Sequence, residues 1–147
     1  MNIYIVSTMS DSGKTAIVSA LLRILSIKGF RASPFKAQNM SLNSYPSIEG
    51  GEIALAQAMQ AYVAGLMPSV YHNPILIKPM LGDKAEYIIL GKPRAQLSFN
   101  HYLNDSSIRR LAINAVKASV RKLIEEYDIV VGEGAGSLTS QTSPVRT

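Results

Sequence analysis

A short run of small and polar residues near the N-terminus has the composition of a phosphate-binding loop. Residues 7–15 read Ser-Thr-Met-Ser-Asp-Ser-Gly-Lys-Thr, between an apolar segment at 3–6 and a helical pattern at 16–28. A strand, a small-residue loop, Gly-Lys-Thr and a helix in this order are typical of a P-loop, whose backbone N–H groups surround an anion. We expect Lys14 to reach the terminal phosphates and the Thr15 hydroxyl to hold Mg²⁺. The predicted nucleotide-binding residues are Ser10, Asp11, Ser12, Gly13, Lys14 and Thr15.

The P-loop pattern departs from its consensus at one position. The pattern G-x-x-x-x-G-K-[ST] has glycine where this chain has Thr8. The alternative interpretation is a small-residue helix N-cap with a solvated Lys14. The position of Gly-Lys-Thr, where a strand should turn into a helix, favours phosphate binding.

Two further polar residues follow predicted strands. Lys36 comes directly after a predicted short strand at residues 31–35, and Glu133 follows a β-branched segment at 129–131. Ligands collect at the carboxyl ends of strands in parallel α/β sheets, so Lys36, Glu133 and the P-loop should face one crevice. A carboxylate opposite the P-loop threonine would complete the coordination of Mg²⁺. The alternative for Glu133 is an exposed acid at a strand end.

The elements that must position these residues alternate along the chain. Alternation of strands and helices predicts an α/β fold with a P-loop NTPase-like, mainly parallel sheet flanked by helices. Residues 36–51 are rich in Asn, Ser, Pro and Gly and are predicted to be a loop. The predicted strands are 2–6, 31–35, 74–79, 87–90 and 129–131, and the predicted helices are 16–28, 52–66 and 106–127.

Composition excludes several kinds of site. The 147 residues contain no cysteine, which excludes disulfides, thiolate metal sites and cysteine nucleophiles and fits a cytoplasmic protein. No apolar run is long enough to span a membrane, and no signal peptide is evident. The net charge of +5 is scattered without interleaved aromatic residues, so no nucleic-acid platform is predicted. His72 and His101 are isolated and lack the spacing of metal ligands.

The chain resembles cobyric acid synthase in several segments. The most specific is Pro-Phe-Lys-Ala-Gln-Asn-Met-Ser-Leu-Asn at residues 34–43, and the likeness extends from residue 1 to 137. The resemblance implies ATP- and Mg²⁺-dependent amidation of side-chain carboxylates in cobalamin biosynthesis, the work of a carbon–nitrogen ligase. The implied corrinoid substrate is adenosylcobyrinic acid a,c-diamide, activated as an acyl phosphate and attacked by ammonia from glutamine. The other similar segments are residues 50–58, 73–79, 91–93 and 127–137.

The resemblance also implies roles for residues of this chain. Lys14 and Lys36 would neutralise the transferring phosphate as catalytic residues. Thr15 and Glu133 would bind Mg²⁺, with Glu52 as a weaker candidate. The substrate region would be lined by residues of the second specific segment, for which loop capping is the alternative role. They are Gln38, Asn39 and Asn43.

The chain departs from the family pattern in three respects. Ser7 stands where the family has its leading P-loop glycine, and its Cβ would crowd the loop if the position needs a positive φ. The likeness stops at 137, so residues 1–137 are expected to be the N-terminal part of an ATP-binding domain and 138–147 an irregular or disordered tail. The family's glutaminase domain, with its cysteine, is not found in this sequence.

These departures leave two further expectations. An incomplete sheet has an open edge, which predicts a homodimer or a partner that covers it. They also leave an alternative function, a non-catalytic nucleotide-binding module that acts in assembly or binding. A DNA-associated P-loop ATPase is a third interpretation, and it would require salt-sensitive DNA binding.

Overall fold

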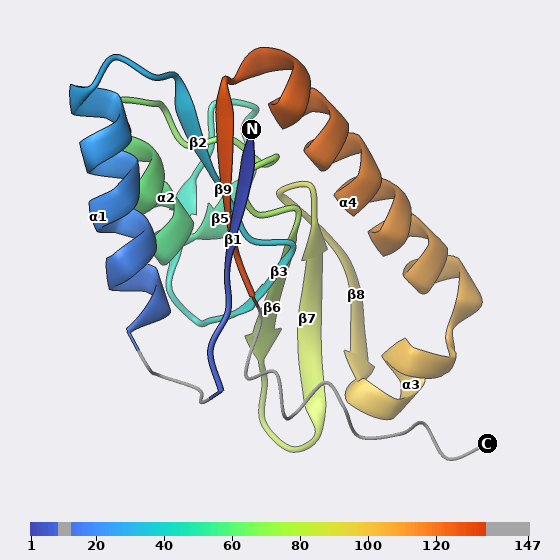
Figure 1. Cartoon of the computed structure of the whole chain (residues 1–147). Helices are drawn as coiled ribbons and strands as arrows, with labels where there is room; N and C mark the ends of the chain where they lie inside the picture. Colours follow the sequence, from blue (N-terminus) through green and yellow to red (C-terminus); the bar gives the residue numbers. More distant parts are fainter. Residues whose placement is uncertain (9–12, 135–147) are drawn as a thin grey trace.

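A parallel sheet lies at the centre of the computed structural model, which describes residues 1–8 and 13–134 (Figure 1). Strand β9 (Ile129–Glu133) lies between β1 (Asn2–Ile5) and β2 (Ala32–Phe35) and pairs with both in parallel. In the described part of the chain β1 pairs only with β9 and forms the edge of this sheet. The predicted homodimer or covering partner remains a prediction.

The chain leaves β2 and enters a second sheet within a few residues. Strand β3 (Gln38–Met40) pairs in parallel with β6 (Ile75–Pro79), which continues antiparallel into β7 (Lys84–Ile89) and β8 (Lys92–Ser98). The junction is held by the Lys36 N–H, which donates to the His72 carbonyl at 2.9 Å. The predicted α/β fold with a mainly parallel sheet is confirmed, and the β6–β7–β8 meander is its antiparallel part.

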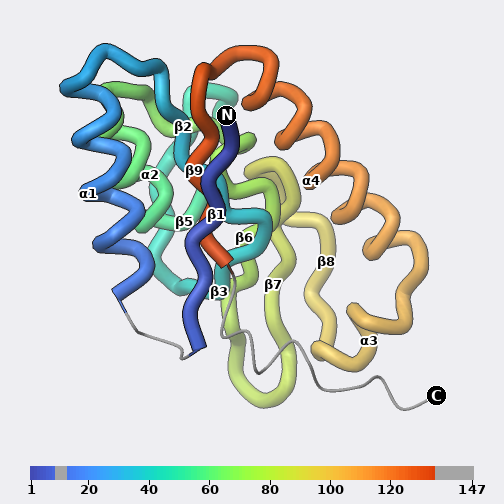
Figure 2. Tube along the Cα trace, in the orientation of Figure 1, coloured from blue at the N-terminus to red at the C-terminus, as the bar shows by residue number. Residues whose placement is uncertain are grey.

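Helices cover both faces of the β1–β9–β2 sheet (Figures 1 and 2). Helices α1 (Lys14–Ile27) and α2 (Leu55–Val63) lie on one face, where Val18 and Leu22 pack with Val131. Helix α4 (Ser106–Glu126) covers the other face, where Leu123 packs with Val130. Successive residues of β9 thus point to opposite layers, as expected of a strand buried on both sides.

The segment 36–54 differs from its prediction. The predicted loop contains β3 and the strand β4 (Ser44–Pro46), and the predicted start of the helix at Glu52 is instead β5 (Glu52–Ala54), paired antiparallel with β4. Helix α2 begins only at Leu55. These short strands depend on hydrogen bonds to distant partners, which local composition does not encode.

Two elements after β7 were also not predicted. Strand β8 is mostly exposed and forms because Leu90 and Gly91, both with positive φ, make a two-residue turn from β7. The short helix α3 (Phe99–Asn104) follows, capped by the Ser98 side chain, which accepts from the His101 N–H. The predicted tail at 138–147 lies outside the described residues.

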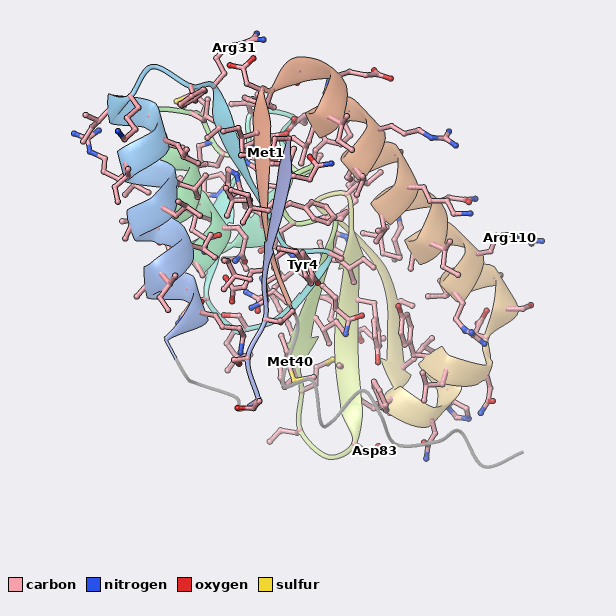
Figure 3. The ribbon with its side chains drawn as sticks, in the orientation of Figure 1. Met1, Tyr4, Arg31, Met40, Asp83 and Arg110 are labelled. Carbon is pink, nitrogen blue, oxygen red and sulfur yellow. The ribbon has the colours of Figure 1, made fainter. Side chains whose placement is uncertain are left out.

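The carboxyl ends of the parallel strands lie together at one end of the molecule. Figure 3 shows Met40, the last residue of β3, and Asp83, between β6 and β7, at this end, with Arg31 at the opposite end before β2. No helix in the described part of the chain is long and apolar enough to cross a membrane.

A close contact between two glycines holds the β4–β5 hairpin against the β7–β8 turn. The Glu52 N–H donates to the Gly91 carbonyl at 3.1 Å, and a Cβ on Gly51 would lie 2.7 Å from the Gly91 Cα. Backbone cannot move aside as a flexible side chain can. Since β5 leads directly into α2, this contact helps to fix the position of that helix.

We predict that Gly51→Ala lowers the free energy of unfolding by about 2–3 kcal/mol, because the added methyl group clashes with backbone. The control is Gly82→Ala, where φ is positive but no atom lies within 4 Å of the added Cβ. That variant should lose only about 1 kcal/mol from backbone strain. Guanidinium unfolding of both variants measures the difference, and equal losses would contradict the proposed clash.

His72 lies buried beneath the β2–β3 junction. Its Nδ1 accepts the Ser69 N–H at 3.2 Å, and its Nε2 has no hydrogen-bond partner among the described residues. Burial lowers the pKa of His72 from 6.5 to about 4, against the opposing charges of Glu49 and Glu126. The imidazole is therefore neutral in the folded protein at pH 7.

We predict that stability falls as the pH is lowered from about 6.5 to about 4. The unfolded chain binds a proton at His72 in this window and the folded chain does not, so the loss approaches about 3 kcal/mol. His72→Gln should remove this part of the pH dependence in denaturant titrations at stepped pH. His101→Gln, altered at an exposed histidine, should retain it, and an unchanged profile in His72→Gln would refute the assignment.

Candidate functional site

The start of α1 places three of the predicted nucleotide-binding residues, Gly13, Lys14 and Thr15. Gly13 has a φ of 82°, a left-handed conformation suited to glycine, and its carbonyl accepts the Ile17 N–H at 3.1 Å. Lys14 and Thr15 form the first turn of the helix. The other predicted members of the loop, Ser10, Asp11 and Ser12, lie outside the described residues.

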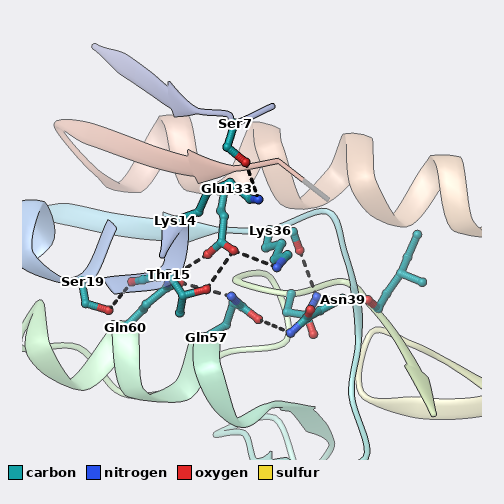
Figure 4. A network of polar contacts seen from close by, with 11 residues as sticks. Ser7, Lys14, Thr15, Ser19, Lys36, Asn39, Gln57, Gln60 and Glu133 are labelled. Atoms are coloured by element: carbon teal, nitrogen blue, oxygen red, sulfur yellow. Dashed lines mark hydrogen bonds and ion pairs between the residues drawn. The ribbon is translucent and has the colours of Figure 1, made fainter. Parts of the chain in front are cut away.

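Glu133 is the centre of a polar cluster at the end of β9 (Figure 4). Its side chain is only 2% exposed. One carboxylate oxygen, Oε1, accepts from the Thr15 hydroxyl at 3.0 Å and from the Lys36 ammonium at 2.8 Å. The structure thus brings together Thr15, Lys36 and Glu133, which lie on separate elements of the chain.

The charge of Glu133 also acts on β1. The pKa of the Tyr4 phenol is raised, chiefly by partial burial and secondarily by the negative charge of Glu133. The ring of Tyr4 lies over Gly132, where an added Cβ would come within 2.4 Å of it. Glycine at 132 therefore lets the β1 side chain cover the strand that carries the carboxylate.

Lys14 contacts Ser7, the residue that stands where the family has its leading P-loop glycine. Its ammonium donates to the Ser7 hydroxyl at 2.8 Å, and the lysine is 8% exposed. Among the described residues, Leu90 is the only non-glycine residue with positive φ, so Ser7 does not adopt the conformation that would strain its Cβ. Serine at this position is therefore compatible with the backbone and supplies a partner for Lys14.

Two glutamines of α2 belong to the site and were not singled out from the sequence. Gln60 donates from Nε2 to the second carboxylate oxygen of Glu133, Oε2, at 3.0 Å. Gln57 lies one turn earlier and is bonded to both Gln60 and Asn39. The available signal was a pair of amides three residues apart on a helix face otherwise occupied by alanine.

The remaining candidates divide between the site and its surroundings. Asn39 is connected to the cluster through Gln57. Gln38 is half-buried on β3, and Asn43 is exposed, with its backbone bonded to Ser41 and Leu55. Asn43 thus has the contacts of a loop-capping residue.

Glu52 lies in a different ion pair. Its carboxylate accepts from the Lys78 ammonium, and none of its described hydrogen bonds reaches Thr15 or Glu133. Burial acts to raise the pKa of Glu52, but the bonds from Lys78 and Ser44 outweigh it, and the pKa is lowered. The metal-ligand prediction is better matched by Thr15 and Glu133.

The donor set of the site suits Mg²⁺ bound together with phosphates. Thr15 and Glu133 offer a hydroxyl and a carboxylate oxygen 3.0 Å apart. No group of three or more His, Cys, Asp or Glu residues that could hold a metal occurs in the described ranges. Mg²⁺ commonly binds through one or two carboxylates plus substrate phosphates, so a full protein cage is not required.

The sequence matches a known family over most of its length. Residues 3–136 match the model of the CbiA family, described as the CobQ/CobB/MinD/ParA nucleotide binding domain. The chain therefore belongs to this family of nucleotide-binding domains, which confirms the predicted P-loop NTPase class.

Individual relatives agree with the resemblance seen in the sequence. The chain is 47% identical over 130 residues to a probable cobyric acid synthase of Methanosphaera stadtmanae, covering 88% of this chain and 26% of the relative. It is 44% identical over 135 residues to one of Methanococcus voltae, covering 92% of this chain and 58% of the relative. The chain thus spans between about a quarter and three-fifths of the length of these two relatives.

We predict that Glu133→Gln lowers the free energy of unfolding by about 2–3 kcal/mol, because it leaves the largely buried Lys36 ammonium without its counter-charge. The control is Glu126→Gln, which removes a half-exposed pair with Lys122 on α4 and should change stability by about 0.5 kcal/mol or less. Denaturant unfolding at neutral pH without divalent cations makes the comparison. Similar losses in the two variants would show that the Glu133 pair contributes no more than a surface pair.

Proposed function

We propose that this member of the CobQ/CobB/MinD/ParA nucleotide-binding family is the ATP-binding part of a cobyric acid synthase-like ligase. In this proposal it activates side-chain carboxylates of a corrinoid, adenosylcobyrinic acid a,c-diamide, for amidation in cobalamin biosynthesis. The observation that carries the proposal is the convergence of Thr15 and Lys36 on the buried Glu133 carboxylate beside Lys14. The probable cobyric acid synthases among the relatives support the choice of substrate.

The chemistry requires that a carboxylate acquire a better leaving group. A carboxylate oxygen of the substrate attacks the γ-phosphorus of ATP, the bond from phosphorus to the ADP oxygen breaks, and an acyl phosphate forms. The nitrogen of ammonia then attacks the acyl carbon, and inorganic phosphate leaves as the nitrogen loses a proton. Both steps move negative charge between oxygens, so catalysis depends mainly on positioning and charge stabilisation.

In this proposal Lys14 and Lys36 act on the phosphates, and Thr15 and Glu133 act on the metal ion. Lys14, at the start of α1, would bind the β- and γ-phosphates, and Lys36 would neutralise the transferring phosphoryl group. Thr15 and Glu133 would hold Mg²⁺, which supplies charge neutralisation at the phosphates. Asn39, and Gln38 beside it on β3, would contact the substrate.

The second candidate function is a non-catalytic nucleotide-binding module that acts in assembly or binding. The observation in its favour is the bond from Lys14 to Ser7, a residue that departs from the family's glycine. A chain of this kind would bind nucleotide and release no ADP when ammonia and the corrinoid are supplied. The same assay therefore separates the two candidates.

We predict that the chain binds Mg·ATP and that Lys14→Ala weakens this binding at least about tenfold, because the ammonium contributes a charge-assisted hydrogen bond to phosphate. Isothermal titration calorimetry measures both affinities. Lys28→Ala, which removes an exposed lysine at the other end of α1, should bind as the parent chain does. Equally weak heats for the parent chain and Lys14→Ala would contradict the nucleotide-binding assignment.

Turnover is tested with Mg·ATP, ammonia and the corrinoid diamide, with ADP release as the measurement. In the proposal Lys36→Met retains Mg·ATP binding and loses ADP release. Binding without ADP release in the parent chain would favour the non-catalytic module.

A further inference from the structure

A chain of three side-chain amides leads from Glu133 to strand β3. Asn39 donates from Nδ2 to Gln57 Oε1 at 3.0 Å, and Gln57 donates from Nε2 to Gln60 Oε1 at 3.3 Å. Gln60 in turn donates from Nε2 to Glu133 Oε2 at 3.0 Å. We call Asn39, Gln57 and Gln60 the amide chain; Figure 4 shows its hydrogen bonds running from β3 through α2 to the end of β9.

The carboxylate sets the direction of every bond in the amide chain. An ionised carboxylate only accepts hydrogen bonds, so Gln60 must turn its NH₂ group toward Glu133 and its oxygen toward Gln57. Gln57 must then turn its NH₂ toward Gln60 and its oxygen toward Asn39. Asn39 is the last member, and its own NH₂ is fixed toward Gln57, which leaves Oδ1 as the acceptor it offers to a ligand.

Burial makes this arrangement costly to disturb. Gln57 and Gln60 are both 0% exposed, and a buried amide that loses its partner has no access to water in exchange. A reversed amide would place two oxygens or two NH₂ groups against each other. The orientation at Glu133 is therefore transmitted to Asn39 without any movement of the backbone.

The two carboxylate oxygens consequently have different neighbours. Oε2 is held by Gln60 from α2, and Oε1 faces Thr15 and Lys36. Gln60 Nε2 also lies 3.5 Å from the Thr15 carbonyl, so one amide contacts both residues expected to bind the metal. Groups that hold a metal-binding carboxylate commonly tune its affinity for the ion.

We propose that Gln57 and Gln60 are positioning residues that orient Glu133 for Mg²⁺ and couple this site to Asn39 on the substrate side. The inference rests on the proposed function for its ligands. Its physical content, that a change at Gln60 reaches Asn39 through Gln57, holds for the unliganded chain as well. Because this coupling can be measured without ligands, the inference and the proposed function can be refuted independently of each other.

The first experiment compares ATP affinity in Mg²⁺ with ATP affinity in EDTA, by calorimetry on the whole chain. We call the ratio of the ATP affinity in Mg²⁺ to the ATP affinity in EDTA the Mg²⁺ gain. In Gln60→Met the Mg²⁺ gain should fall about tenfold, while the ATP affinity in EDTA stays within about twofold of that of the parent chain. Gln96→Met is the matched control, because Gln96 donates to Glu86 on an exposed surface. A full Mg²⁺ gain in Gln60→Met would overturn the proposal and leave the proposed function intact.

Variants at Gln57 test the direction of the amide chain. Gln57→Met leaves the Gln60–Glu133 bond in place, so the Mg²⁺ gain should fall by about threefold or less. In Gln57→Glu the new carboxylate can only accept hydrogen bonds, so it draws the NH₂ group of Gln60 toward itself and away from Glu133. The Mg²⁺ gain should therefore fall about tenfold, as in Gln60→Met. The same Mg²⁺ gain in Gln57→Glu and Gln57→Met would overturn the proposal.

The second experiment needs no ligand. The side-chain NH₂ resonances of Asn39 are followed by NMR in the parent chain, Gln60→Met and Gln57→Met. Both variants should shift them, although Gln60 has no hydrogen bond to Asn39, whereas Gln96→Met should not. An unshifted Asn39 signal in folded Gln60→Met would overturn the proposal. If the parent chain fails to bind Mg·ATP, the proposed function fails, and the NMR result alone then decides the inference.

Discussion

A buried carboxylate is the constraint on which the site depends. Glu133 is almost completely removed from water, and an ionised acid in such a place needs hydrogen bonds or a counter-charge to remain charged. Its partners come from the start of α1, the end of β2 and the middle of α2. Each of these elements must therefore be placed accurately relative to β9, and the fold supplies that placement.

The strand order explains how distant residues reach this carboxylate. Parallel strands end at the same edge of a sheet, so Ser7 after β1, Lys36 after β2 and Glu133 at the end of β9 lie at one end of the sheet. Helix α2 reaches the same place from one face of the sheet, because the β4–β5 hairpin that precedes it is fixed against the β7–β8 turn by the Gly51–Gly91 contact. The backbone contact between Gly51 and Gly91 thus helps to fix where Gln57 and Gln60 lie.

Sequence patterns predicted the parts of the structure that local signals determine. Apolar periodicity identified β1, α1, β2, α4 and β9, and the rule that ligands collect at strand ends brought Lys36 and Glu133 together with Thr15. The β4–β5 hairpin and β8 were missed because their pairing depends on distant partners and a positive-φ turn at Leu90. Gln57 and Gln60 were missed because helical periodicity does not reveal which buried position faces a carboxylate.

The contact between Lys36 and Glu133 has a consequence for the order of events at the site. In the unliganded chain the Lys36 ammonium neutralises Glu133 at Oε1, the oxygen that also accepts a hydrogen bond from the Thr15 hydroxyl. In the proposed function Thr15 and Glu133 would hold Mg²⁺, and its double positive charge would supply the neutralisation that Lys36 gives Glu133 in the unliganded chain. Lys36, 12% exposed and on a flexible four-carbon stem, would then be released toward incoming phosphate. In the proposed function, binding of the metal-bound nucleotide would thus provide a counter-charge for Glu133 and leave Lys36 to neutralise the phosphoryl group.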